Sequence, residues 1–470
     1  MSAPGRDEPS RDAPPREQPP VVVTRGPDAP AVYVARHAGA VAHAATARAA
    51  LAAVGRPAVV DPTGIAGVLW RGAPVDAHLP LDGVVGVPAG GSAELRGDGV
   101  VMTGPATDAA PSDLALLEAR LLAEVRGPAF AVLTRGAHGS LALLALRRLA
   151  DEPEGDALTI HWPGAPERDV TEAGRTARAL HARHHVLRPD ADEPEAALAR
   201  WCATCDLPSL EDFRAMLVDA ALARAGVARA ATSAGAPALF GVGEPFASVA
   251  HGGWRLALRS RPPRVPPDAF DLAGQRAVER AALARVPLHA AQVALALLPA
   301  GTRAALSTAG PRPPDGTPGL ASRAAAVAEA ALRALSDGEL RAPSPRTWRP
   351  YLAAPVVAAV RGLPPRARFG RLGSGGPLRN WLRRAHGWVN RAPAEGFHVT
   401  LDRWLRGPWA GWLARTLAPG RLAAQGLWKP EGVARLVASW QASATAEAAR
   451  AVFVVAATVA WVDRVRGTDP

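Results

Sequence analysis

Lysine is almost absent from this chain of 470 residues: Lys429 is the one lysine, and arginine supplies the rest of the basic charge. Lysine and arginine together number 54 against 43 aspartates and glutamates, so the formal net charge is +11. The arginines are scattered singly rather than gathered in runs, a pattern typical of GC-biased coding. We therefore expect no nucleic acid among the partners, although a basic module that binds RNA or an acidic protein stays open as an alternative.

Cysteine is also scarce, with Cys202 and Cys205 forming one C-x-x-C pair. A structural zinc site needs a second pair or two nearby histidines, and neither follows. A redox-active pair needs a strand before it and a helix that opens at it, whereas Asp206-Leu207-Pro208 comes next. The pair therefore predicts neither a metal centre nor a redox centre.

Long apolar segments are missing as well. The N-terminal stretch is rich in proline and charge, unlike a signal sequence, and the longest late apolar run, residues 451–462, is too short to span a bilayer. Together with the scarcity of cysteine, this predicts a cytoplasmic protein with no membrane partner. Aromatic residues make up 5% of the chain, and the tryptophans of the C-terminal half, at helical spacing, are expected in the core.

The first 111 residues divide into two parts. Residues 1–30 have almost no apolar periodicity and are predicted to be a disordered arm. Residues 31–111 are expected to form a small α+β unit. It would contain an alanine-rich helix over 40–54 and a strand over 81–87 that ends in the turn Pro88-Ala89-Gly90-Gly91.

Strand and helix patterns alternate over residues 127–245, which predicts an α/β fold with a parallel sheet covered by helices on both faces. Ligands of such sheets bind at the carboxyl ends of the strands, here residues 134–140 and 233–241. The predicted strands are 129–133, 157–162, 185–187 and 228–232. The predicted helices are 112–126, capped by Ser112-Asp113, then 141–150, 170–181, 193–203 and 210–225.

The first of these strands leads into the loop Thr134-Arg135-Gly136-Ala137-His138-Gly139-Ser140. Such a loop offers backbone N–H groups and the positive end of a helix dipole, which suit a phosphate. It matches neither the Walker A pattern nor the dinucleotide glycine pattern. Taken alone, it fits an ordinary strand-to-helix turn at least as well.

After Gly243 the pattern changes to helices separated by proline-rich connectors, so residues 246–466 are expected to be mainly helical. The predicted helices are 275–298, 321–335, 355–361, 376–389, 401–418, 430–442 and 446–465.

A run near the C-terminus carries a family resemblance: Gly396-Phe397-His398-Val399-Thr400-Leu401-Asp402-Arg403-Trp404-Leu405-Arg406-Gly407-Pro408 resembles the G-F-x-x-P-L-x-x-W-L-R-G segment of the asparagine synthetase family. Four other segments of this chain also resemble segments of that family. They are Gly426-Leu427-Trp428, Pro350-Tyr351-Leu352, Leu239-Phe240-Gly241 and His184-His185-Val186. In layout the chain is similar to the lasso-peptide macrolactam cyclases and β-lactam synthetases. Its composition, rich in alanine and arginine, is typical of an actinobacterial genome.

The resemblance implies a truncated amidotransferase-like α+β domain over residues 31–111 and an asparagine synthetase-like domain over residues 112–466. The second domain would combine an adenine-nucleotide α-hydrolase-like (PP-loop) parallel sheet, residues 127–245, with a helical half, residues 246–466. Glutamine-hydrolysing members use a cysteine at the mature N-terminus, and Ser2 stands there instead. No glutaminase activity is therefore expected.

By family position, the resemblance implies an ATP site, but this chain departs from the family pattern within it. Arg135 replaces a glycine, where a side chain crowds the approach of backbone to phosphate, and His138 replaces an aspartate. Pro237-Ala238 replace the Asp-Glu pair, so no carboxylate remains there for magnesium. No metal ligand is predicted, and ATP and Mg²⁺ are expected cofactors only if the protein is active. The candidate ATP-site residues are Thr134, Arg135, Gly136, Ser140, Ser233 and Gly235, and the candidate catalytic residues are His138 and Tyr351.

At three further positions, this chain lacks the charged residue that the resemblance leads us to expect. Arg346 and Ala353 stand where acidic residues are expected, and Ala394 stands where the family has a lysine. The loss of one preorganised charge at a transition state costs about 10²- to 10³-fold in rate, and here several are lost together.

These observations lead to three hypotheses of function. The first is a non-catalytic or strongly modified member of the family that acts with a precursor peptide or a pathway protein in peptide or amide natural-product biosynthesis. The second is an active ATP-dependent macrolactam cyclase or amide ligase with a rebuilt site that uses Arg135, His138 and Ser140. The third is the basic RNA- or protein-binding module.

Overall fold

The computed structural model describes residues 21–26, 31–71, 79–96, 99–103, 110–126, 131–133, 137–152, 155–190, 193–241, 346–369, 376–387, 397–443 and 446–468. Within these ranges, no helix is long and apolar enough to cross a membrane. The helices predicted over 275–298 and 321–335 lie outside the described residues.

A five-stranded sheet with strand order β11-β10-β7-β8-β9 forms the centre of the larger unit, and each described pair of neighbours is parallel. The α/β fold predicted from the alternating pattern is confirmed. The fifth strand, β11, comes from far downstream and is too short to be found from sequence. The strands are β7 (Ala131–Leu133), β8 (Asp156–Ile160), β9 (Arg183–Leu187), β10 (Ala230–Ala231) and β11 (Thr347–Trp348).

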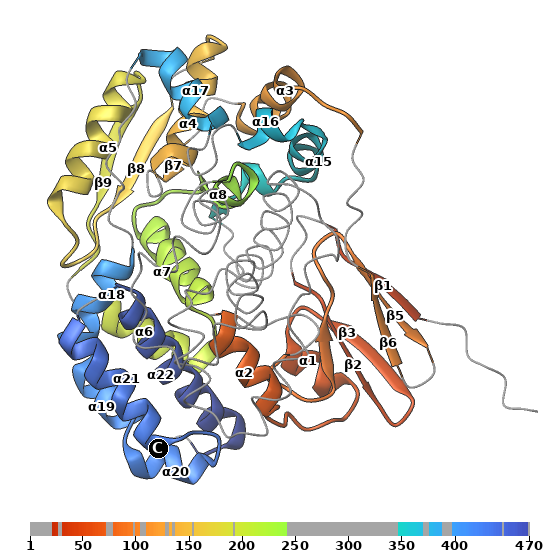
Figure 1. Ribbon diagram of the computed structural model, residues 1–470. Coiled ribbons are helices and arrows are strands. Elements are labelled where there is room, and N and C mark those ends of the chain that lie inside the picture. Colours follow the sequence, from red (N-terminus) through yellow and green to blue (C-terminus); the bar gives the residue numbers. More distant parts are fainter. Residues whose placement is uncertain are drawn as a thin grey trace, which may run out of the picture.

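Consecutive strand residues face opposite sides of the sheet, as the two-residue period of a strand requires. Val132 faces one hydrophobic core and Leu133 the other. The first core contains α4 (Ala137–Leu149) and part of α5 (Glu167–Ala179), whereas the second contains α6 (Glu193–Thr204) and α7 (Leu210–Arg224). The sheet is therefore covered on both faces, as Figure 1 shows with α5 outside β8 and β9 and α7 on the inner side.

The first core is completed by four more of the described helices: α3 (Leu114–Val125), α8 (Ala236–Leu239), α15 (Ala354–Gly362) and α17 (Gly376–His386). The short helix α16 (Pro365–Phe369) is tied to α8 by the 2.9 Å hydrogen bond that Nε of Arg368 donates to the carbonyl of Leu239. The carboxylate of Asp113 accepts a 2.8 Å hydrogen bond from the N–H of Leu116 and caps α3, whereas the Ser112 hydroxyl donates to the carbonyl of Ala359 on α15. The predicted capped helix over 112–126 is thus confirmed, with Asp113 as the cap.

The C-terminal helices are α18 (Phe397–Arg406), α19 (Ala410–Thr416), α20 (Pro419–Gln425), α21 (Pro430–Ser443) and α22 (Ala446–Arg466). The single helix predicted over 401–418 is wrong, because Gly407-Pro408 separate α18 from α19. The apolar run 451–462 lies in α22 and is almost entirely buried. Most tryptophans described in the C-terminal half are core residues as predicted: Trp381, Trp404, Trp409, Trp428, Trp440 and Trp461 are buried, and Trp348 and Trp412 are partly buried against the two cores.

The N-terminal part contains two three-stranded antiparallel sheets, with orders β1-β5-β6 and β3-β2-β4. Their strands are β1 (Val21–Thr24), β2 (Tyr33–His37), β3 (Ala40–Ala44), β4 (Val84–Gly86), β5 (Ser92–Arg96) and β6 (Gly99–Thr103), with the helices α1 (Ala47–Ala53) and α2 (Pro62–Arg71) beside them. The predicted strand over 81–87 is confirmed in its centre as β4.

Two predictions for this part are wrong. Residues 21–24 do not belong to a disordered arm, because they form β1 and pair with β5, with Val23 buried between the sheets. Residues 40–44 are not helical, because the left-handed turn Ala38-Gly39, with φ of 47° and 82°, returns the chain as β3 beside β2. Alanine's helix preference is a weak local term that pairing with β2 overrides.

The N-terminal part has a small apolar cluster between its two sheets, and its helices share a larger core with the C-terminal helices. Leu51 of α1 and Ile65 of α2 belong to the same buried cluster as Phe453 and Trp461 of α22. Figure 1 shows α2 and α22 next to each other at the junction. The two parts are therefore joined by buried apolar surface, which is the dominant favourable term in folding.

Candidate active site at the carboxyl edge of the sheet

The strand order reverses between β7 and β10. From β7 the chain passes through α4 to β8 and through α5 to β9, and then through α6 and α7 to β10 on the other side of β7. The segments that follow β7 and β10 leave the sheet at the same edge, and both enter the hydrophobic core that contains α4 and α8. In open α/β sheets a ligand crevice forms at such a reversal. The predicted location of the site, at residues 134–140 and 233–241, thus coincides with this edge.

The first turn of α4 packs directly on the segment after β10. A Cβ added at Gly139 would lie 2.7 Å from Cβ of Ser233 and 3.0 Å from Cβ of Ala236. Real Cβ atoms do not approach carbon atoms so closely, so the contact requires a residue without a side chain. Gly139 therefore allows the two segments on either side of the strand reversal to touch.

Tyr351 joins a third segment to this contact. Its hydroxyl donates a 2.7 Å hydrogen bond to the carbonyl of Gly139, and its ring packs edge-on against Phe240 with centroids 6.0 Å apart. The side chain is fully buried, and burial raises the pKa of Tyr351 well above its ordinary value. The phenol is therefore neutral at physiological pH and engaged with the backbone, which makes Tyr351 a positioning residue for α4.

Gly235 holds the second segment in shape. It precedes α8 with a φ of +89°, a conformation that L side chains rarely adopt, and a Cβ there would lie 2.7 Å from Cδ2 of Leu352. Segments 139–140, 233–236 and 351–352 thus meet at one place. The structure brings together four of the residues predicted for the site, namely Ser140, Ser233, Gly235 and Tyr351.

Ser140 differs from its neighbours in its hydrogen bonding. It is fully buried in the first turns of α4, and its Oγ has no hydrogen-bond partner among the described residues. A buried hydroxyl without a partner costs free energy, so such groups often mark a place where a water or ligand binds.

Thr134, Arg135 and Gly136, predicted for the ATP site, lie outside the described residues. His138 belongs to the first turn of α4, and its side chain is not among those described. The prediction that residues 137–140 form a loop is wrong, because α4 begins at Ala137 rather than at residue 141. The helix extends to Ala137 because its first turn is packed against Ser233 and Ala236.

Comparison with known protein families decides which proteins this arrangement is related to. The sequence model for asparagine synthase matches residues 139–463. The chain belongs to the asparagine synthase family. The enzymes of this family are ATP-dependent ligases that form amides. No curated protein matches the chain.

Membership in the asparagine synthase family raises the question of whether the residues present fit Mg²⁺-ATP. Pro237 and Ala238 lie in α8, and Ala238 is fully buried against apolar neighbours. No aspartate or glutamate occurs within residues 137–140, 232–241 or 348–353. Among the described residues, no group of three or more histidines, cysteines, aspartates or glutamates could hold a metal ion. These segments therefore do not fit a magnesium ion, which prefers carboxylate oxygens.

Arg346 has a structural role at the start of β11. Its backbone N–H and its guanidinium both donate to Asp219 of α7, at 3.2 and 3.1 Å. Its carbonyl accepts from the N–H of Ala230, so this pair places β11 beside β10.

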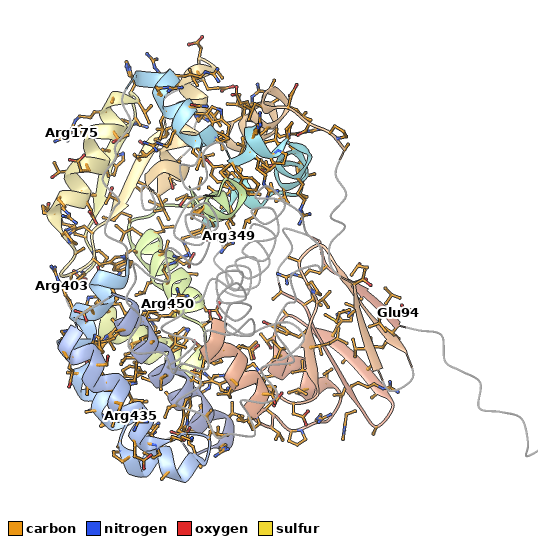
Figure 2. All side chains as sticks on the ribbon, in the orientation of Figure 1. Glu94, Arg175, Arg349, Arg403, Arg435 and Arg450 are labelled. Atoms are coloured by element: carbon orange, nitrogen blue, oxygen red, sulfur yellow. The ribbon has the colours of Figure 1, made fainter. Side chains whose placement is uncertain are left out.

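Sequence reasoning missed the charged residues that follow the outer strands of the same edge. Arg349 follows β11 and lies close to α8 in Figure 2. His161 follows β8 and Arg188 follows β9. Arg188 directly follows the predicted strand 185–187 and His161 lies near the end of the predicted strand 157–162, which is where ligand-binding residues of α/β proteins gather. Arg349 had no such signal, because β11 was not predicted.

The C-x-x-C pair lies far from this edge, at the end of α6 beside α22. Nη1 of Arg464 donates to the carbonyl of Cys202 at 2.9 Å and lies 3.9 Å from Sγ of Cys205. Burial raises the pKa of the Cys205 thiol to about 12, so this thiol is protonated and unreactive at neutral pH.

Proposed function

We propose that this protein is an asparagine synthase-like protein without glutaminase activity whose ATP site is degenerate. It would act as a non-catalytic or strongly modified member of the family in peptide or amide natural-product biosynthesis. Its partner would be a precursor peptide or another protein of the pathway. ATP and Mg²⁺ would be cofactors only of an active form.

One observation carries this proposal. At the reversal between β7 and β10, the positions at which the family has its Asp-Glu pair form the buried apolar helix α8, packed under Leu352 and Tyr351. A carboxylate placed at Ala238 would be buried without a partner, which costs several kcal/mol in proteins. The core around Ala238 is packed for a small apolar side chain. Restoring a carboxylate at this position would therefore require the surrounding core to change as well.

A second candidate, an active ligase with a rebuilt site, is favoured by Ser140. Its buried hydroxyl has no partner among the described residues and stands near the start of α4 at the strand reversal. A ligand oxygen or amide there would satisfy it. In this candidate, His138 of the same first turn would act as base, and arginine rather than a metal would neutralise the ligand's negative charge.

Calorimetry with ATP, with and without Mg²⁺, followed by a pyrophosphate-release assay with amino acids and peptides, separates the two candidates. The proposal expects no pyrophosphate release, with or without Mg²⁺. ATP binding with pyrophosphate release under either condition would overturn it and establish the rebuilt ligase.

Ser140→Ala is the matched variant for this experiment. Because the hydroxyl has no protein partner among the described residues, its removal breaks no described hydrogen bond and should leave the melting temperature nearly unchanged. If wild-type protein binds a nucleotide and this variant binds it about tenfold more weakly, Ser140 contacts the ligand. Equal affinities would place the nucleotide elsewhere.

A further inference from the structure

A cluster of charged and polar groups lies where the N-terminal part meets the C-terminal helices. Its centre is the turn after α6, which contains Cys205 and Asp206. The carboxylate of Asp206 accepts from the backbone N–H groups of Ala47 and Arg48 at the start of α1, at 2.6 and 3.3 Å. The carbonyl of Asp206 accepts a 2.8 Å hydrogen bond from Nε1 of Trp461 on α22. The start of α1 and one face of α22 are therefore held against the same turn.

Arg464 lies on the same face of α22 as Trp461, three residues further along the helix. Its Nη1 donates a 2.9 Å hydrogen bond to the carbonyl of Cys202 and lies 3.9 Å from Sγ of Cys205. An arginine side chain stays charged in proteins, and a bond to a backbone carbonyl does not neutralise that charge. The end of α6 thus holds a positive charge at this junction.

The guanidinium of Arg48 has one edge that no protein group satisfies. Its Nε and Nη2 atoms are both buried, and neither has a hydrogen-bond partner among the described residues. These two nitrogens lie on the same side of a guanidinium, and their N–H groups point in parallel, so together they form one complete fork for two oxygen atoms. Buried donors without a protein partner cost free energy and commonly bind a water or a ligand. The fork of Arg48 is therefore arranged to bind an oxyanion.

The charges of Arg48 and Arg464 repel each other at this junction. Burial, and after it the charge of Arg464, lowers the pKa of Arg48 below its ordinary value. Asp206 and Cys205 act in the opposite direction without reversing the shift, and both carboxylate oxygens of Asp206 already accept from the backbone of α1. A second carboxylate, Asp212 of α7, acts on the Cys205 thiol and accepts nothing from Nε or Nη2 of Arg48. An anion bound by both guanidiniums would offset their repulsion.

We propose that Arg48 and Arg464 form a binding site for a phosphate group, either free phosphate or a phosphate ester, at the junction of α1 and α22. A tetrahedral dianion offers two oxygens to the fork of Arg48 and a further oxygen to the second guanidinium, whereas a planar carboxylate matches one fork alone. The site contains no residue from the segments that directly follow the strands of the parallel sheet, and it is independent of the function proposed above. Bound phosphate would stabilise the contact between the N-terminal part and the C-terminal helices by mass action.

The experiment measures the binding of inorganic phosphate, methyl phosphate and acetate to the full chain by calorimetry, in chloride buffer of constant ionic strength. The test variant is Arg48→Met, which removes the fork and keeps an unbranched side chain. The matched control is Arg435→Met, at an exposed arginine of α21 that Figure 2 labels. Arg48→Met should bind phosphate at least about tenfold more weakly than wild type and Arg435→Met. Arg48→Lys, which keeps the charge but not the fork, should also bind more weakly than wild type, and it replaces Arg48→Met if that variant is unstable.

Melting temperatures give a second measurement. Phosphate should raise the melting temperature of wild type but not of Arg48→Met, whereas without phosphate Arg48→Met should melt no lower than wild type, because it removes buried donors that lack a protein partner. A lower melting temperature of Arg48→Met without phosphate would overturn the proposal, since the protein itself would then satisfy Arg48.

The relative affinities identify the ligand. Both possible orders of inorganic phosphate and methyl phosphate support the site, the first favouring free phosphate and the second a phosphate ester. Equal phosphate affinities of wild type and Arg48→Met would overturn the proposal, because phosphate would then bind elsewhere in the protein. Acetate binding to wild type as tightly as phosphate would overturn it too, because the site would not select a tetrahedral anion.

Discussion

The hydroxyl of Tyr351 donates a 2.7 Å hydrogen bond to the carbonyl of Gly139, 212 residues earlier in the chain. The bond lies in the buried contact between η2 (Pro350–Leu352), a single 3₁₀ turn, and the first turn of α4. It sets the position of the α4 start relative to the segment after β10. The candidate site is therefore assembled by residues from three distant stretches of sequence.

Tyr351→Phe tests this bond. The ring stays, but the Gly139 carbonyl loses a buried donor, so the free energy of unfolding should fall by about 1–3 kcal/mol. Urea unfolding of both proteins measures this. If the variant were as stable as wild type, another donor or a water would have to satisfy the Gly139 carbonyl.

Gly139→Ala tests the close packing at the strand reversal. The new Cβ would lie 2.7 Å from Cβ of Ser233, so α4 and the segment after β10 must separate, and we expect a loss of about 1–3 kcal/mol. The matched control is Gly420→Ala in α20, where a Cβ meets nothing within 4 Å. That change should stabilise by about 0.5–1 kcal/mol, because alanine is the better helix former. Thermal unfolding of both variants should therefore give shifts of opposite sign.

Asp206→Ala tests the junction of the N-terminal part. The Asp206 carboxylate accepts from the backbone N–H groups of Ala47 and Arg48, at 2.6 and 3.3 Å, and so caps α1 from 159 residues away. Loss of the cap should cost about 1 kcal/mol and speed hydrogen exchange at α1 and in α22, whose Trp461 donates a 2.8 Å hydrogen bond to the carbonyl of Asp206. Thr46→Ala is the control, since Thr46 caps the same helix locally through Ala49. Identical exchange in α22 for both variants would show that Asp206 does not couple the two parts.

His184 should make stability depend on pH. Its Nε2 lies 2.9 Å from Oγ1 of Thr159, and burial, with help from Arg178 and His185, lowers the pKa of His184 below its ordinary 6.5. The unfolded chain therefore takes up this proton first, so stability is complete above pH 6.5 and falls as the pH drops below it. The slope should be well under ~1.4 kcal/mol per pH unit, because the side chain is only partly buried.

Two variants isolate the His184 contribution. His184→Asn should flatten the dependence of the unfolding free energy between pH 6.5 and pH 5. His185→Asn, on the other face of β9 beside Asp156, should leave most of the His184 contribution in place, because burial is its largest cause. If both variants flattened the pH dependence of the unfolding free energy, that dependence would belong to β9 as a whole rather than to His184.

Cys205 should resist alkylation in the folded protein. Burial raises the pKa of its thiol to about 12, above its ordinary value of 9.0, so almost no thiolate exists at pH 8. Since the unfolded chain loses this proton first, the same shift lowers stability as the pH rises from 9 toward 12. Iodoacetamide labelling followed by mass spectrometry should modify the half-buried Cys202 well before Cys205. Equal labelling at pH 8 would mean that the end of α6 opens readily.

Much of the larger unit was predictable, because its helices and strands carry their own periodicity. The alternation over residues 127–245 predicted a parallel sheet, and the rule for strand reversals placed the site at the ends of β7 and β10. The errors came where a distant partner outweighs local preference. The composition around Val21–Thr24 predicts a charged, disordered arm, but this segment pairs with β5. The alanine content of Ala40–Ala44 predicts a helix, but this segment pairs with β2.

The sequence by itself determined the family and the α/β class, and it puts Pro237 and Ala238 in the candidate site. These depend on motifs and on spacing within short stretches. Only the tertiary structure decided that Gly139, Gly235 and Tyr351 meet, that α8 is buried, and that Arg48 and Arg464 lie at the same turn after α6. Such contacts join residues that are far apart in the chain or lie in different elements, and close packing in three dimensions, rather than local periodicity, selects them.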